Sequence, residues 1–157
     1  IILFFYIVSG KNLYKIHHDT TVKELTIVSE MSLTIGLFTL VVGNFLGGIW
    51  ANESWGRYWS WDPKETWAFI SVMVCAFVLH MRLVPGLRGR WAFNVATMFA
   101  FCSMVMTYFG VNYYLSGLHS YAAGDPVPIP AWVYIGVSTM FLLAFFSFFK
   151  FKKLNRK

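Results

Sequence analysis

Residues 62–83 read DPKETWAFISVMVCAFVLHMRL and carry the clearest helix signal in the chain. Asp62 is a good N-cap, Pro63 suits the first helical position, and Glu65 lies three residues after the cap, as in a capping box. The apolar run that follows is about as long as a helix needs to be to cross a bilayer, and a Pro-Gly pair ends it. We therefore predict a transmembrane helix over residues 63–83.

Other apolar runs lie on both sides of this helix. Backbone polar groups in hydrocarbon must be bonded within the protein, so long apolar runs are expected to be helices. Complete helices are predicted at about residues 22–50, 92–115 and 131–149, and a truncated one at 1–9. The first run has less than half of the ~20 residues that a span needs, and residue 1 is not Met. We expect one all-α transmembrane domain over residues 1–157, a polytopic helical bundle that is the C-terminal part of a longer protein.

The first complete helix has two local signals. Thr21 and Glu24 have the spacing of a capping box, which predicts that the helix starts at Val22. Gly43 and Gly47 form a small-xxx-small face, which lets another helix approach closely.

Composition agrees with a membrane protein. The chain is 57% apolar and 13% charged, and soluble domains carry about 25% charged residues. Much of the net charge of +6 lies in the tail at residues 150–157, directly after an apolar helix, so it does not indicate nucleic-acid binding. Cys75 and Cys102 lie in separate apolar runs without CxxC spacing, and no CxxCH occurs. This chain is therefore not itself a c-type cytochrome.

The positive charges also predict an orientation. Residues 11–23, the turn at 82–90 and the tail at 150–157 hold three, three and five Lys or Arg. The alternate segments, 52–65 and 116–130, hold two and none. By the positive-inside rule the first set, including the tail, is cytoplasmic and the second set lies on the outer face.

The connector at residues 50–67, predicted to be on the outer face, reads WANESWGRYWSWDPKETW and holds five Trp and one Tyr. An aromatic belt combined with helix capping is one explanation. Belt aromatics are usually spread over several helix ends, whereas here they lie in one connector with charged residues between them. A flat apolar platform edged with cations suits a planar ligand that bears carboxylates, such as a porphyrin. The residues alone leave both interpretations open.

Residues 55–67, WGRYWSWDPKETW, resemble the tryptophan-rich (WWD) signature of haem-handling membrane proteins. The continuation WDPKETWAFI is more similar to the CcsA/ResC branch of cytochrome c synthesis (System II) than to the CcmC or CcmF branches. GLHSY, which carries His119, is similar to the outer-face histidine motif of that branch. The resemblance covers about residues 36–131. It implies a WWD domain that holds haem at the outer face of the inner (cytoplasmic) membrane, between two axial histidines.

Carried over to this chain, the resemblance implies axial ligation of the haem iron by His119, in the outer loop at 116–130. Neutral imidazole is a usual axial ligand. The other implied haem b contacts are Trp55, Trp59, Trp61, Asp62 and Arg57, with Arg57 and Lys64 as candidate partners of the propionates. Capping of the helix is the alternative role for Asp62. The family's second outer histidine has no match here, because His17 and His18 fall on the cytoplasmic side, and we expect it in the missing N-terminal part.

His80 lies inside a predicted span, about 17 residues or roughly 26 Å from the N-cap. By depth alone it can be an interfacial histidine beside Arg82. The family, however, has a membrane-embedded histidine on the helix after the WWD signature that is proposed to receive haem in transit, so the resemblance favours a transit haem ligand. Glu30 lies at a similar depth and is either a hydrogen-bond partner of His80 or a residue that reaches the interface.

The function implied by the resemblance is transport and presentation of haem, followed by its covalent attachment to the CxxCH thiols of apocytochrome c. The chain would then be part of a holocytochrome c synthase, with a CcsB/ResB-type partner, separate or fused. The pattern assigns no catalytic acid or base and no nucleic-acid partner. A CcmC-like haem exporter or chaperone-loading module without ligation activity is the alternative. A third, an ordinary transporter with an aromatic belt, predicts no haem absorption.

Overall fold

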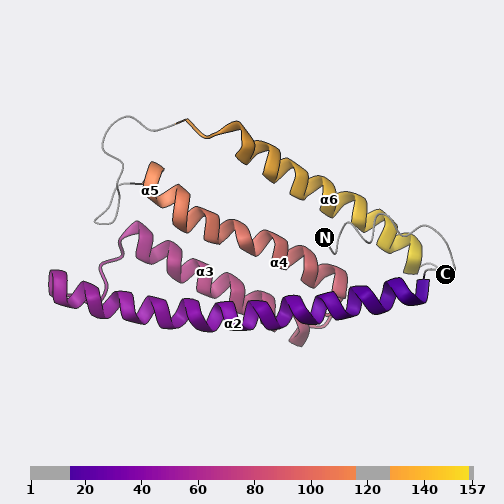
Figure 1. Cartoon of the computed structure of the whole chain (residues 1–157), viewed down its shortest axis with the longest axis horizontal. Coiled ribbons are helices and arrows are strands. Elements are labelled where there is room, and N and C mark those ends of the chain that lie inside the picture. Colours follow the sequence, from indigo (N-terminus) through magenta and orange to yellow (C-terminus); the bar gives the residue numbers. More distant parts are fainter. Residues whose placement is uncertain (1–14, 116–127, 156–157) are drawn as a thin grey trace. The chain divides into compact units, whose positions relative to one another are not determined.

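The computed structural model describes residues 15–115 and 128–155 (Figure 1). The long helices are α2 (Lys15–Trp55), α3 (Pro63–His80), α4 (Arg90–Val105) and α6 (Ala131–Asn155). A 3₁₀ turn, Met81–Leu83, follows α3. A π-helical segment, Met106–Gly110, continues α4 into the short helix α5, Val111–Tyr114. The described residues contain no strand.

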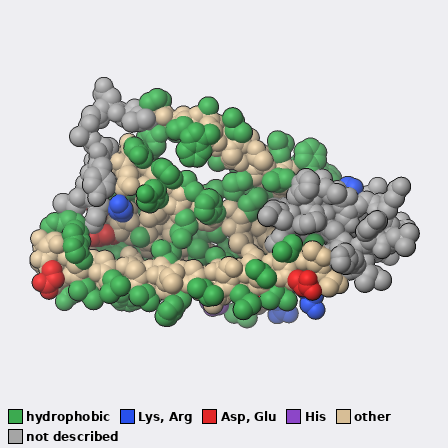
Figure 2. All heavy atoms as spheres, in the orientation of Figure 1, with side chains coloured by type: hydrophobic (Ala, Val, Ile, Leu, Met, Phe, Trp, Pro, Cys, Tyr) green, Lys and Arg blue, Asp and Glu red, His purple; other side chains and the backbone are tan. Residues whose placement is uncertain are grey.

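Four helices are long and apolar enough to cross a membrane: Thr20–Trp55, Pro63–Leu83, Arg90–Tyr114 and Ala131–Lys152. The predicted all-α fold with four complete spans is therefore confirmed. Large hydrophobic side chains are exposed along these helices, as Figure 2 shows for the visible face. Extended apolar surface of this kind is unusual on a soluble monomer and is expected where lipid or other membrane helices surround the protein. The truncated helix expected at residues 1–9 lies outside the described residues.

Helix α2 is longer than predicted at both ends. Thr21 lies inside the helix, so the prediction that Thr21 and Glu24 cap its start at Val22 was wrong. Residues 15–21 contain neither Pro nor Gly, so nothing in the sequence stops the helix there. Its 41 residues correspond to about 60 Å at 1.5 Å per residue, roughly twice the hydrocarbon thickness. Part of α2 must therefore extend beyond the hydrocarbon or run at a tilt.

The other helices also differ from their predicted ends. Helix α6 continues to Asn155, so the basic tail expected from residue 150 begins as helix. The span predicted as 92–115 begins at Arg90 and changes to π geometry at Met106. Single π turns inside α-helices are frequent at functional sites.

The chain divides into two compact units. One comprises residues 1–32, 80–99 and 129–157. Its described core centres on Val22 of α2, which is 1% exposed and packs against partly buried side chains from α4 and α6, namely Trp91, Val95, Met98 and Phe151. The Trp91 indole stacks on the Phe151 ring at 6.0 Å and donates from Nε1 to Ser147 Oγ at 2.9 Å. Trp91 therefore joins α4 to α6.

The second unit comprises residues 33–79 and 100–128. Inside it the hydroxyls of Ser71 and Thr107 are 3.0 Å apart, and Ser71 is fully buried. Thr107 Oγ1 also lies 3.0 Å from the carbonyl oxygen of Trp67, in the first turns of α3. Thr107 belongs to the π-helical segment, where a Cβ on Gly110 would overlap the Met106 side chain. These contacts fasten α3 to the π segment close to the Trp-rich connector.

Candidate functional site: the Trp-rich connector

The connector between α2 and α3 ends in the predicted helix cap. Asp62 Oδ2 accepts the backbone N–H of Lys64 at 3.2 Å, and the Asp62 carbonyl accepts that of Thr66 at 2.9 Å. In return the Asp62 N–H donates to Glu65 Oε2 at 3.3 Å. The capping box read from the sequence is therefore confirmed, and Asp62 is only 6% exposed.

Glu65 does more than complete the cap. The same oxygen, Oε2, accepts the backbone N–H of Ser60 at 2.8 Å and lies 3.2 Å from the Ser60 hydroxyl. One carboxylate therefore holds the backbone on both sides of Trp61. Hydrogen bonds to a charged acceptor are stronger than neutral ones, so Glu65 fixes this part of the connector. The contacts to Ser60 could not be predicted from the local sequence pattern.

Trp61 has an unusual backbone conformation. Its φ is 60°, in the left-handed region that costs an L-residue roughly 1–2 kcal/mol. The Thr66 hydroxyl donates to its carbonyl at 3.3 Å, and the Glu65 contacts hold the residues on either side. The ring itself is 71% exposed. Backbone strain that the surroundings enforce is often found at ligand sites.

The aromatic rings of the connector meet edge to face. The Trp59 ring lies 5.8 Å from Trp61 and 6.3 Å from Phe69, and Trp50 lies 5.0 Å from Trp55. Trp59 Nε1 is buried and has no hydrogen-bond partner among the residues that the structure describes. A buried indole N–H usually finds an acceptor. This atom is therefore a donor to which a ligand oxygen could bind.

Close backbone contact places the connector against the end of α2. The chain turns at Gly56, whose φ is 70° and whose N–H donates to the Asn52 carbonyl at 2.8 Å. A Cβ on Gly48 would lie 3.3 Å from the carbonyl oxygen of Tyr58. The bare Cα of Gly48 therefore leaves room for the returning chain. By contrast, a Cβ on Gly43 or Gly47 would have no atom of the described residues within 4 Å.

The two cations of the connector are placed differently. Lys64 is half-buried, and its ammonium donates to Asn112 Oδ1 of α5 at 3.1 Å. The Arg57 side chain is exposed. Arg57 is thus the more accessible of the two candidate partners for a ligand carboxylate.

The other predicted site residues lie elsewhere. His119 is outside the described residues, as is most of the loop at 116–130. His80 is the last residue of α3 and is exposed. It belongs to the first compact unit, whereas the connector belongs to the second.

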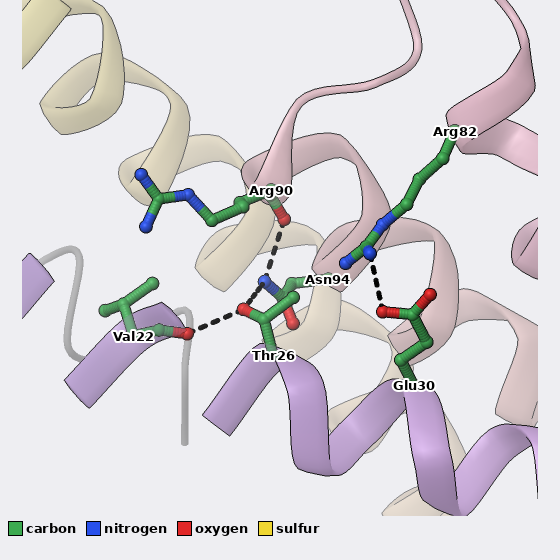
Figure 3. A network of polar contacts seen from close by, with 6 residues as sticks. All are labelled: Val22, Thr26, Glu30, Arg82, Arg90 and Asn94. Carbon is green, nitrogen blue, oxygen red and sulfur yellow. Dashed lines mark hydrogen bonds and ion pairs between the residues drawn. The ribbon is translucent and has the colours of Figure 1, made fainter. Parts of the chain in front are cut away.

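Near His80 in the chain, the structure shows a polar cluster that sequence reasoning had only partly anticipated. The Arg82 guanidinium lies 2.7 Å from the Glu30 carboxylate (Figure 3). Its central carbon lies 5.3 Å from the centre of the Phe93 ring. Glu30 thus contacts a residue two positions beyond His80. The hydrogen bond between Glu30 and His80 stays a prediction.

Four spans and an aromatic connector closed by a helix cap define a multi-pass helical membrane protein. The chain belongs to the Cytochrome C assembly protein family, whose model matches residues 2–119. It is 56% identical over 110 residues to Protein NrfI of Wolinella succinogenes. It is 46% identical over 113 residues to the cytochrome c biogenesis protein CcsA of Prochlorococcus marinus strain MIT 9515, and 44% over 118 residues to CcsA of Guizotia abyssinica.

These alignments cover 70%, 72% and 75% of this chain, but 12%, 36% and 35% of the respective relatives. The chain therefore corresponds to about a third or less of each relative. The chain is thus similar to part of proteins that are named for cytochrome c biogenesis.

Proposed function

We propose that, in the full-length protein, this chain presents haem b on the Trp-rich connector and takes part in its covalent attachment to the CxxCH thiols of apocytochrome c. Membership of the Cytochrome C assembly protein family and the likeness to proteins named CcsA support this assignment. The same likeness favours the CcsA branch over a CcmC-like exporter. A CcsB/ResB-type protein, separate or fused, is the proposed partner.

One observation carries the proposal furthest, the hydrogen bond of 3.1 Å between Lys64 and Asn112. It joins the part of the connector that forms the first turn of α3 to α5, within one compact unit. The described chain leaves α5 at Leu115, four residues before His119. Only four residues separate Leu115 from His119 in the sequence, and a fully extended segment of that length spans at most about 14 Å. This tether supports ligation by His119 of a haem that rests on the connector.

Each connector residue then has a distinct role. The exposed Trp61 ring, Trp59 and Trp55 form the apolar surface against the porphyrin, and Trp59 Nε1 offers a hydrogen bond to a propionate. Arg57 pairs with a propionate as an exposed cation. Asp62 is buried and caps α3. It therefore stabilises the backbone conformation of the connector and does not need to contact haem.

The proposed attachment of haem requires little acid–base catalysis by this chain. Each cysteine thiol adds across a haem vinyl group: a C–S bond forms, the S–H bond and the vinyl π bond break, and the thiol hydrogen ends on the neighbouring vinyl carbon. No electrons are gained or lost in that addition. The protein contributes position, iron ligation and exclusion of water.

The proposed topology follows the positive-inside rule, with the connector and His119 on the outer face of the inner (cytoplasmic) membrane and the C-terminal tail in the cytoplasm. His80, inside a span, is the proposed ligand of haem in transit. Ionisable residues within spans are costly and are commonly kept for such roles.

The test is maturation of a reporter cytochrome c in cells that carry the complete gene product, the CcsB/ResB-type partner where it is a separate protein, and the apocytochrome. We expect His119→Ala in the full-length protein to abolish holocytochrome formation, while His18→Ala, on the predicted cytoplasmic side, leaves it unchanged. Undiminished holocytochrome in the His119 variant would defeat the proposed ligand. Bound haem without any thioether formation by the unaltered protein would instead favour the exporter.

A further inference from the structure

We propose that Glu30 and Arg82 are positioning residues for His80: their ion pair fixes the turn that ends α3 and so holds the imidazole where haem in transit can reach it. This inference rests on the proposed role of His80 as a transit ligand. The pair lies within one compact unit, together with His80 itself.

The backbone changes geometry at His80. Helix α3 ends there with φ −87° and ψ −5°, and a 3₁₀ turn, Met81–Leu83, follows at once. Met81 is 5% exposed, and its carbonyl accepts the N–H of Val84 at 3.1 Å. Arg82 lies in the middle of this turn, so whatever holds Arg82 also limits where His80 can move.

Arg82 is held from two other helices. Its Nη1 lies 2.7 Å from Glu30 Oε2 on α2, and its guanidinium carbon lies 5.3 Å from the centre of the Phe93 ring on α4. Figure 3 shows the guanidinium and the carboxylate pointing toward each other. The side chains of Arg82 and Glu30 are 40% and 29% exposed, so the pair is partly shielded. Partial shielding from water strengthens the attraction between the two charges.

The two helices that hold Arg82 are themselves joined beside the ion pair. One turn before Glu30, Thr26 Oγ1 accepts the Asn94 amide at 2.9 Å and donates to the Val22 carbonyl at 2.7 Å. Asn94 follows Phe93 directly and donates also to the Arg90 carbonyl at 2.8 Å (Figure 3). Thr26 and Asn94 are 1% and 5% exposed. These hydrogen bonds between α2 and α4 therefore fix the helix segments that carry Glu30 and Phe93.

A restraint of this kind is important for a ligand residue at the end of a helix. His80 is exposed and directly precedes the turn, so without a tie the last turn of α3 could fray and the imidazole could leave its place. A ligand that has to meet a moving porphyrin depends on a preorganised position. The ion pair supplies that restraint at the turn that directly follows His80.

The experiment uses the full-length protein in membranes and measures the part of its haem spectrum that is lost in His80→Gly. We expect Glu30→Gln and Arg82→Gln each to lower this His80-dependent signal by about two- to five-fold, as the loss of a partly exposed ion pair would give. The charge exchange Glu30→Arg with Arg82→Glu should restore most of it. Glu24→Gln, an exposed glutamate of the same helix, should change nothing.

A second arm separates positioning from general stability. Free imidazole added to His80→Gly supplies the ligand without a tether, so in that background Glu30→Gln should have no further effect. An equal loss of haem in the imidazole-supplied background would overturn the inference, because Glu30 would then act on the fold alone. So would a full His80-dependent signal in Glu30→Gln. A His80→Gly protein with an unchanged spectrum would remove the proposed transit role as well, which distinguishes the two failures.

Discussion

The Lys64 ammonium donates a hydrogen bond of 3.1 Å to Asn112 Oδ1, which joins two residues that are 48 positions apart in the chain. Lys64 lies in the first turn of α3, within the Trp-rich connector, and Asn112 lies in α5. This bond ties the connector to the segment of chain that leads into the loop of His119.

Loss of the acceptor should therefore loosen the site. Asn112→Ala leaves the half-buried Lys64 ammonium with one partner fewer, at a cost of about 1 kcal/mol, and should lower the haem content of the purified full-length protein. Asn112→Asp keeps an acceptor and should retain haem. Thermal unfolding in detergent and the haem-to-protein ratio measure both effects. Unaltered values for Asn112→Ala would show that the bond does not hold the two segments together.

Glu65 should be required for the backbone conformation of the connector. Glu65→Ala removes the acceptor of three contacts, from the Asp62 N–H and from the N–H and hydroxyl of Ser60, and should destabilise the protein by about 2–3 kcal/mol. Protease cleavage within the connector should become faster, and haem retention should fall. The matched control is Glu53→Ala, because Glu53 is an exposed residue of the same region. Equal cleavage rates in the two variants would contradict this role.

Substitutions of Trp61 should affect the stability of the protein and its haem binding differently. Trp61→Gly removes the ring but also relieves the strain of a φ of 60°, whereas Trp61→Ala removes the ring and keeps the strain. The glycine variant should therefore be more stable than the alanine variant by about 1 kcal/mol. Both should bind haem less well than the unaltered protein, since both lack the exposed indole. Full haem binding by either variant would show that the Trp61 ring is not part of the platform.

Two adjacent glycines of α2 should respond differently to a methyl group. Gly47→Ala meets open space and should gain about 1 kcal/mol from higher helix propensity. In Gly48→Ala the new Cβ would lie 3.3 Å from the Tyr58 carbonyl oxygen, so most of that gain should be lost. The larger Gly48→Leu should push the connector away and reduce haem binding. The melting temperatures and haem contents of the three variants test this prediction. Identical behaviour at both positions would argue against a close approach between Gly48 and the Tyr58 carbonyl.

The helices could be predicted from the sequence because hydrocarbon leaves the backbone few alternatives. The start of α3 was also predictable, since Asp62, Pro63 and Glu65 are local signals of a helix cap, and the structure confirms it. Thr21 and Glu24 show the weakness of the same pattern. A capping-box spacing also occurs inside helices, and without Pro or Gly nearby it does not end one.

The remaining features depend on contacts that a local pattern does not encode. The π-helical segment at Met106 is stabilised by partners from α3, including the Trp67 carbonyl that Thr107 approaches. Arg82, which pairs with Glu30, lies in the 3₁₀ turn after His80, whereas the sequence suggested only a depth shared by Glu30 and His80. His119 was selected as the candidate axial ligand through the family motif, and both its role and its place beside the connector stay predictions.

The central claim is that the Trp-rich connector and His119 hold one haem. The most direct measurement is the absorption spectrum of the purified full-length protein, compared with its His119→Ala and Trp59→Ala variants. We expect a Soret band in the unaltered protein, its loss or marked shift on replacement of His119, and a weaker band on replacement of Trp59. A protein without haem absorption, or a band that neither substitution alters, would contradict it.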